Sequence, residues 1–274
     1  MTGDEGSASV VKRSVTRVTP ASLERFEDSL ALERALEIRI DGRALSITLR
    51  TPGHDEELVL GFLAGEGVIR SRADVAAWQA VPAPHQGAPD VLELRLAPGA
   101  VFDWSKLERN FASTAACGLC GRTHLDSMHA GLQAAQGDAR FSTAAVLALS
   151  ARVAAAQAAF ASTGGIHAAA WCDASLEPRV LREDVGRHNA VDKVCGWLLG
   201  ESRYGSGEGL LWVSGRAGAE IVHKAARARL PALAAVGAPS SLAIELAQTA
   251  GMTLIGFLRE GRMNVYTGVE RIDA

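Results

Sequence analysis

The 274-residue chain has few cysteines, no long apolar run and no large excess of charge of either sign. Its four cysteines are too few for a disulfide framework, so we expect a reducing, cytoplasmic environment. The 28 basic and 31 acidic residues give a net charge of −3, which argues against a dedicated nucleic-acid binder. No apolar run reaches the roughly 18 residues needed to cross a bilayer, so we expect no membrane contact. The polar residues 1–20 carry no pattern of a secretory signal.

The composition is that of an ordinary folded protein, with 48% apolar and 22% charged residues, which excludes a disordered chain. Its length suffices for one large domain or two modest ones. We predict a flexible leader over residues 1–22, because Gly, Ser, Thr and basic residues occur there without apolar periodicity. A smaller β-rich N-terminal subdomain over 23–101 and an α/β domain over 102–274 are predicted to follow.

In the N-terminal subdomain, apolar and polar residues alternate over residues 36–40 and 45–49, on either side of Asp41-Gly42. Period-two alternation around this dipeptide predicts a β-hairpin. Residues 56–66 predict a helix, and residues 91–96 predict another strand.

In the second domain, predicted strands alternate with predicted helices, which favours an α/β layer with crossover connections and a largely parallel sheet. Strands are predicted at 166–171, 180–181, 210–213, 233–236, 252–258 and 263–267. Helices are predicted at 144–161, within 184–199, and at 219–230 and 242–250.

The most informative stretch for chemistry is Cys117-Gly118-Leu119-Cys120-Gly121. Two thiols in C-x-x-C spacing can form half of a zinc site, a redox dithiol or a thiolate that carries sulfur. His124 and His129 lie too close for a two-Cys two-His finger, and no second C-x-x-C exists. A redox pair normally follows the first strand of a βαβ unit, whereas this pair lies between two predicted units. On the residues alone, the three uses remain open.

Other motifs, taken with this one, resemble the FdhD family, the sulfur-carrier proteins that mature formate dehydrogenases. The stretch CGLCG at 117–121 resembles the CGxCG signature of that family. The other matching stretches are ELVLGFL with EG over 57–67, TGGIHAA at 163–169, EDVGRHNAVDK at 183–193, SGR at 214–216 and PSS at 239–241. The resemblance covers about residues 32–271.

The resemblance implies a sulfurtransferase in which Cys117 takes sulfur from a cysteine desulfurase as a persulfide, with Cys120 in a supporting role. The sulfur passes to the Mo-bis(molybdopterin guanine dinucleotide) cofactor, or its tungsten form, before insertion into the catalytic subunit of formate dehydrogenase. This cofactor is a bound substrate, and no permanent metal is expected on the protein. The resemblance also implies a homodimer and a cytidine-deaminase-like three-layer α/β core. A non-catalytic cofactor chaperone and a redox or zinc module are the alternatives.

Such a cofactor carries phosphates, which favour backbone N–H groups at glycine-rich turns and helix starts. Parallel α/β sheets collect these loops along one edge. The candidate binding residues of this kind are Gly165, Arg187, His188, Ser214, Gly215, Arg216 and Ser240. The resemblance adds the segment Phe257, Leu258, Arg259, Glu260, Gly261 and Arg262, which on its residues alone predicts a plain β-hairpin. Arginine side chains at 187, 216 and 262 could add bidentate phosphate contacts.

Overall fold

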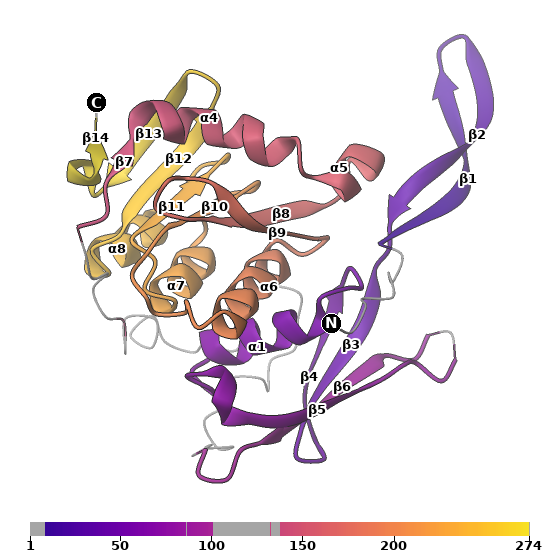
Figure 1. The fold of residues 1–274 in the computed structure, drawn as a ribbon. Coiled ribbons are helices and arrows are strands. Elements are labelled where there is room, and N and C mark those ends of the chain that lie inside the picture. The colour runs from indigo at the N-terminus through magenta and orange to yellow at the C-terminus, as the bar shows by residue number, and fades with distance from the viewer. Residues whose placement is uncertain (1–8, 86, 101–131, 133–137, 274) are drawn as a thin grey trace.

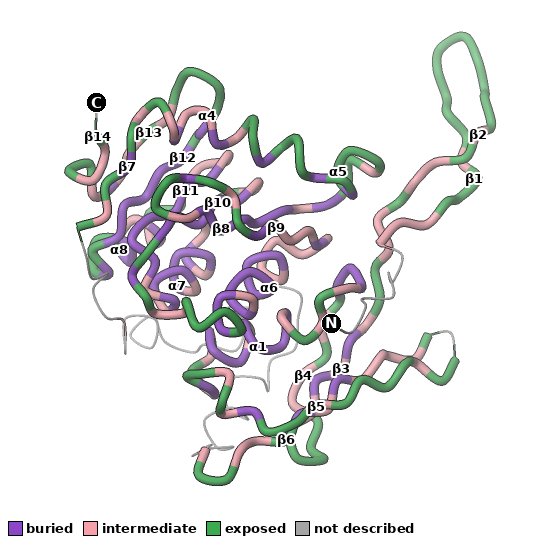
Figure 2. Tube along the Cα trace, in the orientation of Figure 1, coloured by how far each residue is buried: buried purple, intermediate pink, exposed green. Residues whose placement is uncertain are grey.

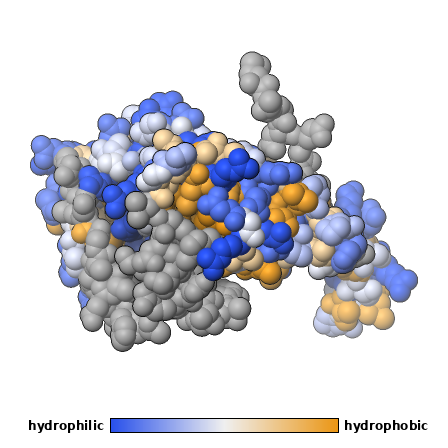
Figure 3. Space-filling model, turned by 90° about the horizontal axis from the view of Figure 1, so that it is seen from below, coloured by the Kyte–Doolittle hydropathy of each residue, from blue (hydrophilic) through white to orange (hydrophobic). Residues whose placement is uncertain are grey.

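The computed structural model describes residues 9–85, 87–100, 132 and 138–273, so Cys117 and Cys120 lie outside the described residues. The described chain forms a mixed α/β fold with a six-stranded central sheet, a four-stranded sheet and two separate strand pairs (Figure 1). None of its helices has the length and apolar character that a membrane crossing requires. Seen from below, the described surface intersperses hydrophobic with hydrophilic residues (Figure 3).

The central sheet has the strand order β13-β12-β11-β10-β8-β9, and each predicted strand of the second domain has its counterpart here. The strands are β8 (His167–Cys172), β9 (Pro178–Asp184), β10 (Leu210–Val213), β11 (Ala232–Ala235), β12 (Thr253–Arg259) and β13 (Arg262–Thr267). Within this sheet, only β10 with β11 and β11 with β12 pair in parallel, so the prediction of a largely parallel sheet is wrong. Short connections join β8 to β9 and β12 to β13, and such hairpins pair strands antiparallel.

Helices cover both faces of the central sheet, which gives three layers (Figure 1). Ala169 and Trp171 of β8 pack in the apolar cluster with α6 (Arg187–Gly200), α7 (Ala219–Arg227) and α8 (Ser241–Thr249). Ala168 and Ala170 alternate to the opposite face and pack in the cluster with α4 (Thr143–Ala154). The period of two along a strand buried on both faces produces these two clusters.

The helix predicted over 144–161 is interrupted in the structure. Helix α4 ends at Ala154, and α5 (Ala158–Thr163) begins after a residue with non-helical backbone, Gln157. The Glu183 carboxylate accepts the N–H groups of Ala159 and Phe160 at 2.9 and 2.8 Å. This carboxylate satisfies the first N–H groups of α5, so a second helix can start where the alanine-rich pattern suggested continuation.

The N-terminal subdomain is the four-stranded sheet, of order β4-β3-β6-β5, covered by α1 (Asp55–Gly65). The predicted hairpin is confirmed as β3 (Arg34–Ile40) and β4 (Arg43–Arg50), and the predicted strand as β6 (Asp90–Leu96). Strand β5 (Val75–Val81) was not predicted, because most of its residues are exposed and show no alternation. Short elements complete the described chain: η1 (Arg72–Asp74), β7 (Phe141–Ser142), η2 (Val269–Arg271) and β14 (Ile272–Asp273).

A long hairpin of β1 (Val10–Thr19) and β2 (Ser22–Ala31) projects from the body and is mostly exposed (Figures 1 and 2). It overlaps the predicted flexible leader over 1–22, which is therefore wrong from Val10 onward. Cross-strand pairs such as Val15 with Phe26 hold the two strands in register. The apolar residues of the two strands do not follow a regular period of two in the sequence, so the strands were not predicted.

Helices α1 and α6 pack with their backbones in close contact. A Cβ atom on Gly61 would overlap the carbonyl group of Asp192, and a Cβ on Gly196 would overlap that of Glu57. Glycine at both positions therefore permits an approach that any side chain would prevent. This contact joins the N-terminal subdomain to helix α6 of the α/β core.

We expect Gly196→Ala to lower the free energy of unfolding by about 1–3 kcal/mol, because the added methyl group has no space between the helices. Gly200→Ala is the matched control in the same helix, since a Cβ there would meet nothing within 4 Å. We expect this control to keep its stability or gain up to about 1 kcal/mol from helix propensity. Denaturant unfolding followed by circular dichroism compares the two, and equal stabilities would contradict the close helix contact.

Candidate functional site

The candidate site lies at the edge of the central sheet where β10, β11 and β12 end. Because these strands are parallel, the loops that follow them meet at this edge. Backbone hydrogen bonds join the loops: Gly237 N–H donates to Gly215 O at 2.9 Å, and Phe257 N–H donates to Gly237 O at 3.1 Å. Strand β8 is antiparallel to β10, so its first residue, His167, lies at the same edge, opposite Asp184 of β9.

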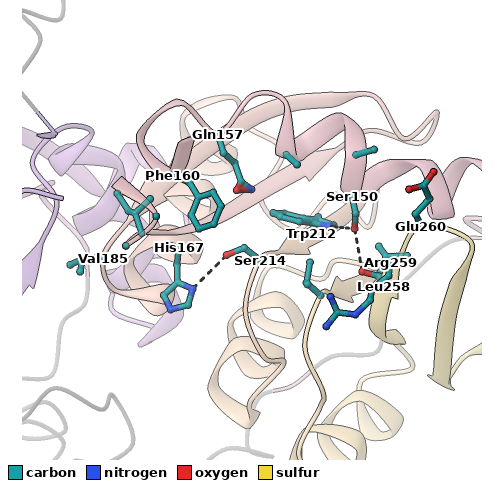
Figure 4. Close-up of a pocket in the computed structure, with 16 residues that line it drawn as sticks. Ser150, Gln157, Phe160, His167, Val185, Trp212, Ser214, Leu258, Arg259 and Glu260 are labelled. Carbon is teal, nitrogen blue, oxygen red and sulfur yellow. Dashed lines mark hydrogen bonds between the residues drawn. The ribbon is translucent and has the colours of Figure 1, made fainter. Parts of the chain in front are cut away.

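A cavity of about 710 Å³ opens beside this edge, on the face of the sheet covered by α4 and α5 (Figure 4). Its volume lies within the range of pockets that hold small molecules and cofactors. It is lined by Ser150, Ala151, Ala154, Gln157, Phe160, Gly164, Gly165, Ile166, His167, Val185, Trp212, Ser214, Val236, Leu258, Arg259 and Glu260. The lining is mostly apolar, and its polar groups come from the loops and strand ends at the sheet edge and, as Ser150 and Gln157, from α4 and the residue before α5.

Hydrogen bonds fix one wall of the cavity. Trp212 Nε1 donates to Ser150 Oγ at 3.2 Å, and the Ser150 hydroxyl donates to the carbonyl of Leu258 at 3.4 Å (Figure 4). Helix α4 is thereby tied to strands β10 and β12. The polar atoms of Trp212 and Ser150 are used in this way, so they contribute an apolar surface and a fixed shape.

His167 brings a titratable group to the cavity. Burial lowers the pKa of His167 below its ordinary value of 6.5, and the positive charges of Arg187 and His188 lower it further. The imidazole is therefore neutral at neutral pH. Ser214 Oγ accepts the N–H of Ala168 at 2.9 Å and lies 3.5 Å from His167 Nδ1, to which its hydroxyl proton can be donated.

The loop after β10 and the start of α6 lie beside His167. A Cβ on Gly215 would stand 3.5 Å from His167 Nδ1 and 3.9 Å from Arg187 Cδ, so these three residues are neighbours. Arg187 is the first residue of α6 and is partly buried, whereas Arg216 is exposed. The N-terminus of a helix and two guanidinium groups give this rim of the site positive electrostatic character.

His188 forms an ion pair with the first turn of α7. Its Nε2 lies 2.6 Å from Oε2 of Glu220, and both side chains are largely buried. Burial alone would raise the pKa of Glu220, but the hydrogen bond and charge of His188 bring that pKa below its ordinary value. The pair connects the starts of α6 and α7 and keeps the Glu220 carboxylate ionised.

The segment 257–262 is a hairpin with an irregular register rather than a plain one. Its pairing shifts between Gly256 and Arg259, and Phe257 adopts a left-handed backbone with a φ of 52°. Phe257 is 39% exposed, an unusual position for a large apolar side chain. Gly261 forms the turn with a φ of 74°. The irregularity directs Leu258 and the residues after it to the cavity wall.

The structure brings most of the predicted cofactor-binding residues to one edge of the sheet. Gly165, Ser214, Leu258, Arg259 and Glu260 line the cavity. Arg187, His188, Gly215 and Arg216 belong to the adjoining loop and helix starts. Ser240 caps α8, and its hydroxyl accepts the N–H of Ala243 at 3.2 Å. Phe257, Gly261 and Arg262 are exposed and do not line the cavity, and the two cysteines lie outside the described residues.

Three residues that line the cavity, Gln157, Phe160 and Trp212, were not predicted from the sequence as site residues. His167 belongs to a matched motif but had no predicted role. Gln157 offered a signal, because it is a polar residue within an alanine-rich apolar stretch. Trp212 offered none, because nothing in a buried strand distinguishes the side chain facing a cavity from one facing the core.

Comparison with known proteins identifies the family. A family model described as the FdhD/NarQ family matches residues 31–273. A curated relative from Nocardia farcinica, named sulfur carrier protein FdhD, is 47% identical over 267 residues, covering 95% of this chain and 94% of its own. A protein of the same name from Anaeromyxobacter dehalogenans is 44% identical over 276 residues, covering 97% and 94%.

The fold has a counterpart among solved structures. A protein described as a formate dehydrogenase accessory protein, from Desulfotalea psychrophila, aligns with a TM-score of 0.77 at 23% identity. The alignment covers 97% of this chain and 100% of that one. The family match over 31–273 and the identity with curated relatives along nearly their whole length lead to one conclusion: the chain belongs to the FdhD/NarQ family.

Proposed function

We propose that this protein is a sulfurtransferase that carries sulfur as a persulfide on Cys117 for the maturation of formate dehydrogenase. The sulfur comes from a cysteine desulfurase and goes to the Mo-bis(molybdopterin guanine dinucleotide) cofactor, held as a bound substrate. In the loading step, the Cys117 thiolate attacks the outer sulfur of the donor persulfide. A new S–S bond forms on Cys117, the S–S bond of the donor breaks, and the donor cysteine leaves as a thiolate, with no net oxidation.

One observation carries this proposal: four of the matched motifs, at 163–169, 183–193, 214–216 and 239–241, contribute residues to one edge of the sheet beside a cavity of about 710 Å³. Curated relatives with 40% identity or more are named sulfur carrier proteins, which supports sulfur as the cargo. The cysteine pair in the CGLCG stretch supports a thiolate as the carrier.

The residues at this edge suit a ligand that is planar and apolar at one end and anionic at the other. The cavity, lined by Phe160 and Trp212 among others, would take a heterocycle. Arg187, Arg216 and the helix starts nearby would take phosphates. When bound, the cofactor supplies the metal centre that receives the sulfur, and the protein holds and orients it.

The remaining parts of the proposal extend the same function. The three-layer arrangement of the core supports a relationship to cytidine deaminases. We also propose a homodimer, a cytoplasmic location, and contacts with the desulfurase and the catalytic subunit of formate dehydrogenase.

The role of Cys117 can be tested by mass spectrometry after incubation with a cysteine desulfurase and cysteine. We expect the wild-type protein to gain roughly 32 Da, the mass of one sulfur atom, on Cys117. Cys117→Ala should gain nothing and should fail to support formate dehydrogenase activity in cells.

Cys195→Ala is the matched control, because Cys195 is buried and burial raises the pKa of its thiol to about 12. This variant should load sulfur like the wild type. A Cys117→Ala protein that still supports full formate dehydrogenase activity would contradict the carrier role and favour a cofactor chaperone.

Phosphate binding at this edge can be tested through the pKa of His167. A bound anion offsets the charge of Arg187, so guanosine 5′-diphosphate should raise the pKa of His167 from its lowered value. Proton uptake then accompanies binding, and the affinity should increase as the pH falls through the two pKa values. An NMR titration of the ring protons measures both states. His167→Gln should lose this pH dependence, and an unchanged pKa would contradict phosphate binding near His167.

A further inference from the structure

Gln157 presents an unusual buried group to the cavity. The residue is only 6% exposed, and its backbone is used by the chain itself: its N–H donates to Ala154 O at 3.2 Å, and its carbonyl accepts from Ala161 N–H at 3.0 Å. Its carboxamide makes no hydrogen bond to any described residue. In Figure 4 the carboxamide points toward the space between the Phe160 and Trp212 side chains.

The Gln157 carboxamide is open to the cavity rather than sealed in the packed core, since Glu220 Oε1 is the only fully buried side-chain polar atom without a hydrogen bond among the described residues. Its hydrogen-bonding capacity is therefore available to a molecule in the cavity. The surroundings do not explain why a polar residue stands here. Ala151, Ala154 and Trp212 line the same cavity with apolar surface, which a leucine would match. A carboxamide that has no partner among the described residues and is directed into a cavity is best explained by a ligand that pairs with it.

A carboxamide recognises a particular chemical pattern. Its oxygen accepts while its nitrogen donates, so it pairs in a bidentate way with a ring that carries an N–H beside a C=O. Guanine has this edge at N1–H and O6, and the pterin ring has the same 2-amino-4-oxopyrimidine edge. Phe160 offers an apolar aromatic side chain beside such a planar ring, and aromatic stacking adds to the hydrogen bonds.

We propose that Gln157 is a specificity-determining residue that binds the 2-amino-4-oxopyrimidine edge of a heterocycle inserted between α5 and the end of β10. The inference rests on the proposed function only for the source of this edge, the guanine or the pterin of the cofactor. The Glu183 carboxylate caps the start of α5 through the N–H groups of Ala159 and Phe160, next to Gln157 in the sequence.

The test compares guanosine 5′-diphosphate with its N1-methyl derivative by isothermal titration calorimetry on the full chain. The two ligands have the same phosphates and ring system, but methylation removes the N–H that the Gln157 oxygen would accept. We expect the wild type to bind the methylated ligand about 10- to 100-fold more weakly. Gln157→Leu should bind both ligands equally, at the wild-type affinity for the methylated one. Pterin and 3-methylpterin form the second pair of ligands, and a difference confined to one pair assigns the edge to that heterocycle.

Gln248→Leu is the matched control, because it makes the same chemical change at an exposed position of α8. It should keep the discrimination of the wild type. Thermal unfolding checks the fold, and Gln157→Leu should be at least as stable as the wild type without ligand.

The proposal would be overturned if Gln157→Leu still discriminated between the two members of both ligand pairs. It would also be overturned if the wild-type protein bound the two members of each pair equally. The calorimetry involves no sulfur transfer, so its outcome is independent of Cys117. A protein that discriminates the ligands but never gains sulfur would contradict the proposed function and support the assignment of Gln157. A protein that loads sulfur normally, while its Gln157→Leu variant binds the ligands like the wild type, would support the proposed function and contradict the assignment of Gln157.

Discussion

The buried ion pair between Asp184 and Lys193 is the interaction on which the site depends. The two side chains are 2.8 Å apart and almost fully buried. Thr51 bonds to both partners: its N–H donates to Asp184 Oδ2 at 3.1 Å, and its carbonyl accepts from Lys193 Nζ at 2.8 Å. Removing one partner of such a pair typically costs about 3–5 kcal/mol, because the other charge is left buried and unpaired. The pair therefore holds the end of β9, the first turns of α6 and the loop after β4 in one arrangement. Arg187 and His188 lie between its two members in the sequence, and this arrangement determines their positions.

Close packing of backbone gives the site its rigidity on the other side. A Cβ on Gly256 would stand 2.8 Å from Pro239 Cδ, and a Cβ on Gly237 would stand 3.0 Å from the carbonyl oxygen of Gly215. The loops after β10, β11 and β12 can therefore be in direct contact only because these positions lack side chains. Gly61 and Gly196 serve the same purpose between α1 and α6. Glycine thus permits close backbone contact both between the loops at the site and between the N-terminal subdomain and α6.

Secondary structure was predicted correctly where the local residue pattern matches the conformation and burial of those residues in the folded chain. The hairpin around Asp41-Gly42 was predictable because both residues take the positive φ values that this dipeptide favours. The break before α5 was not, since it depends on Glu183, a residue distant in sequence from the helix that it caps. The mixed sheet was mispredicted because periodicity identifies strands but not their pairing partners. For the site, glycine turns and motif arginines indicated the polar rim, whereas Gln157 and Trp212 required the three-dimensional arrangement to show which side chains share a cavity.

The division of the site between an apolar cavity and a polar rim limits what it can hold. A small anion such as sulfide or inorganic phosphate would leave the cavity of about 710 Å³ unfilled and the aromatic surfaces of Phe160 and Trp212 without contact. A purely apolar molecule would leave the guanidinium of Arg187 and the amide of Gln157 unpaired. A large ligand with both a heterocycle and phosphates would satisfy the two regions together, and it would be held by groups that the ion pair and the glycine contacts have already fixed.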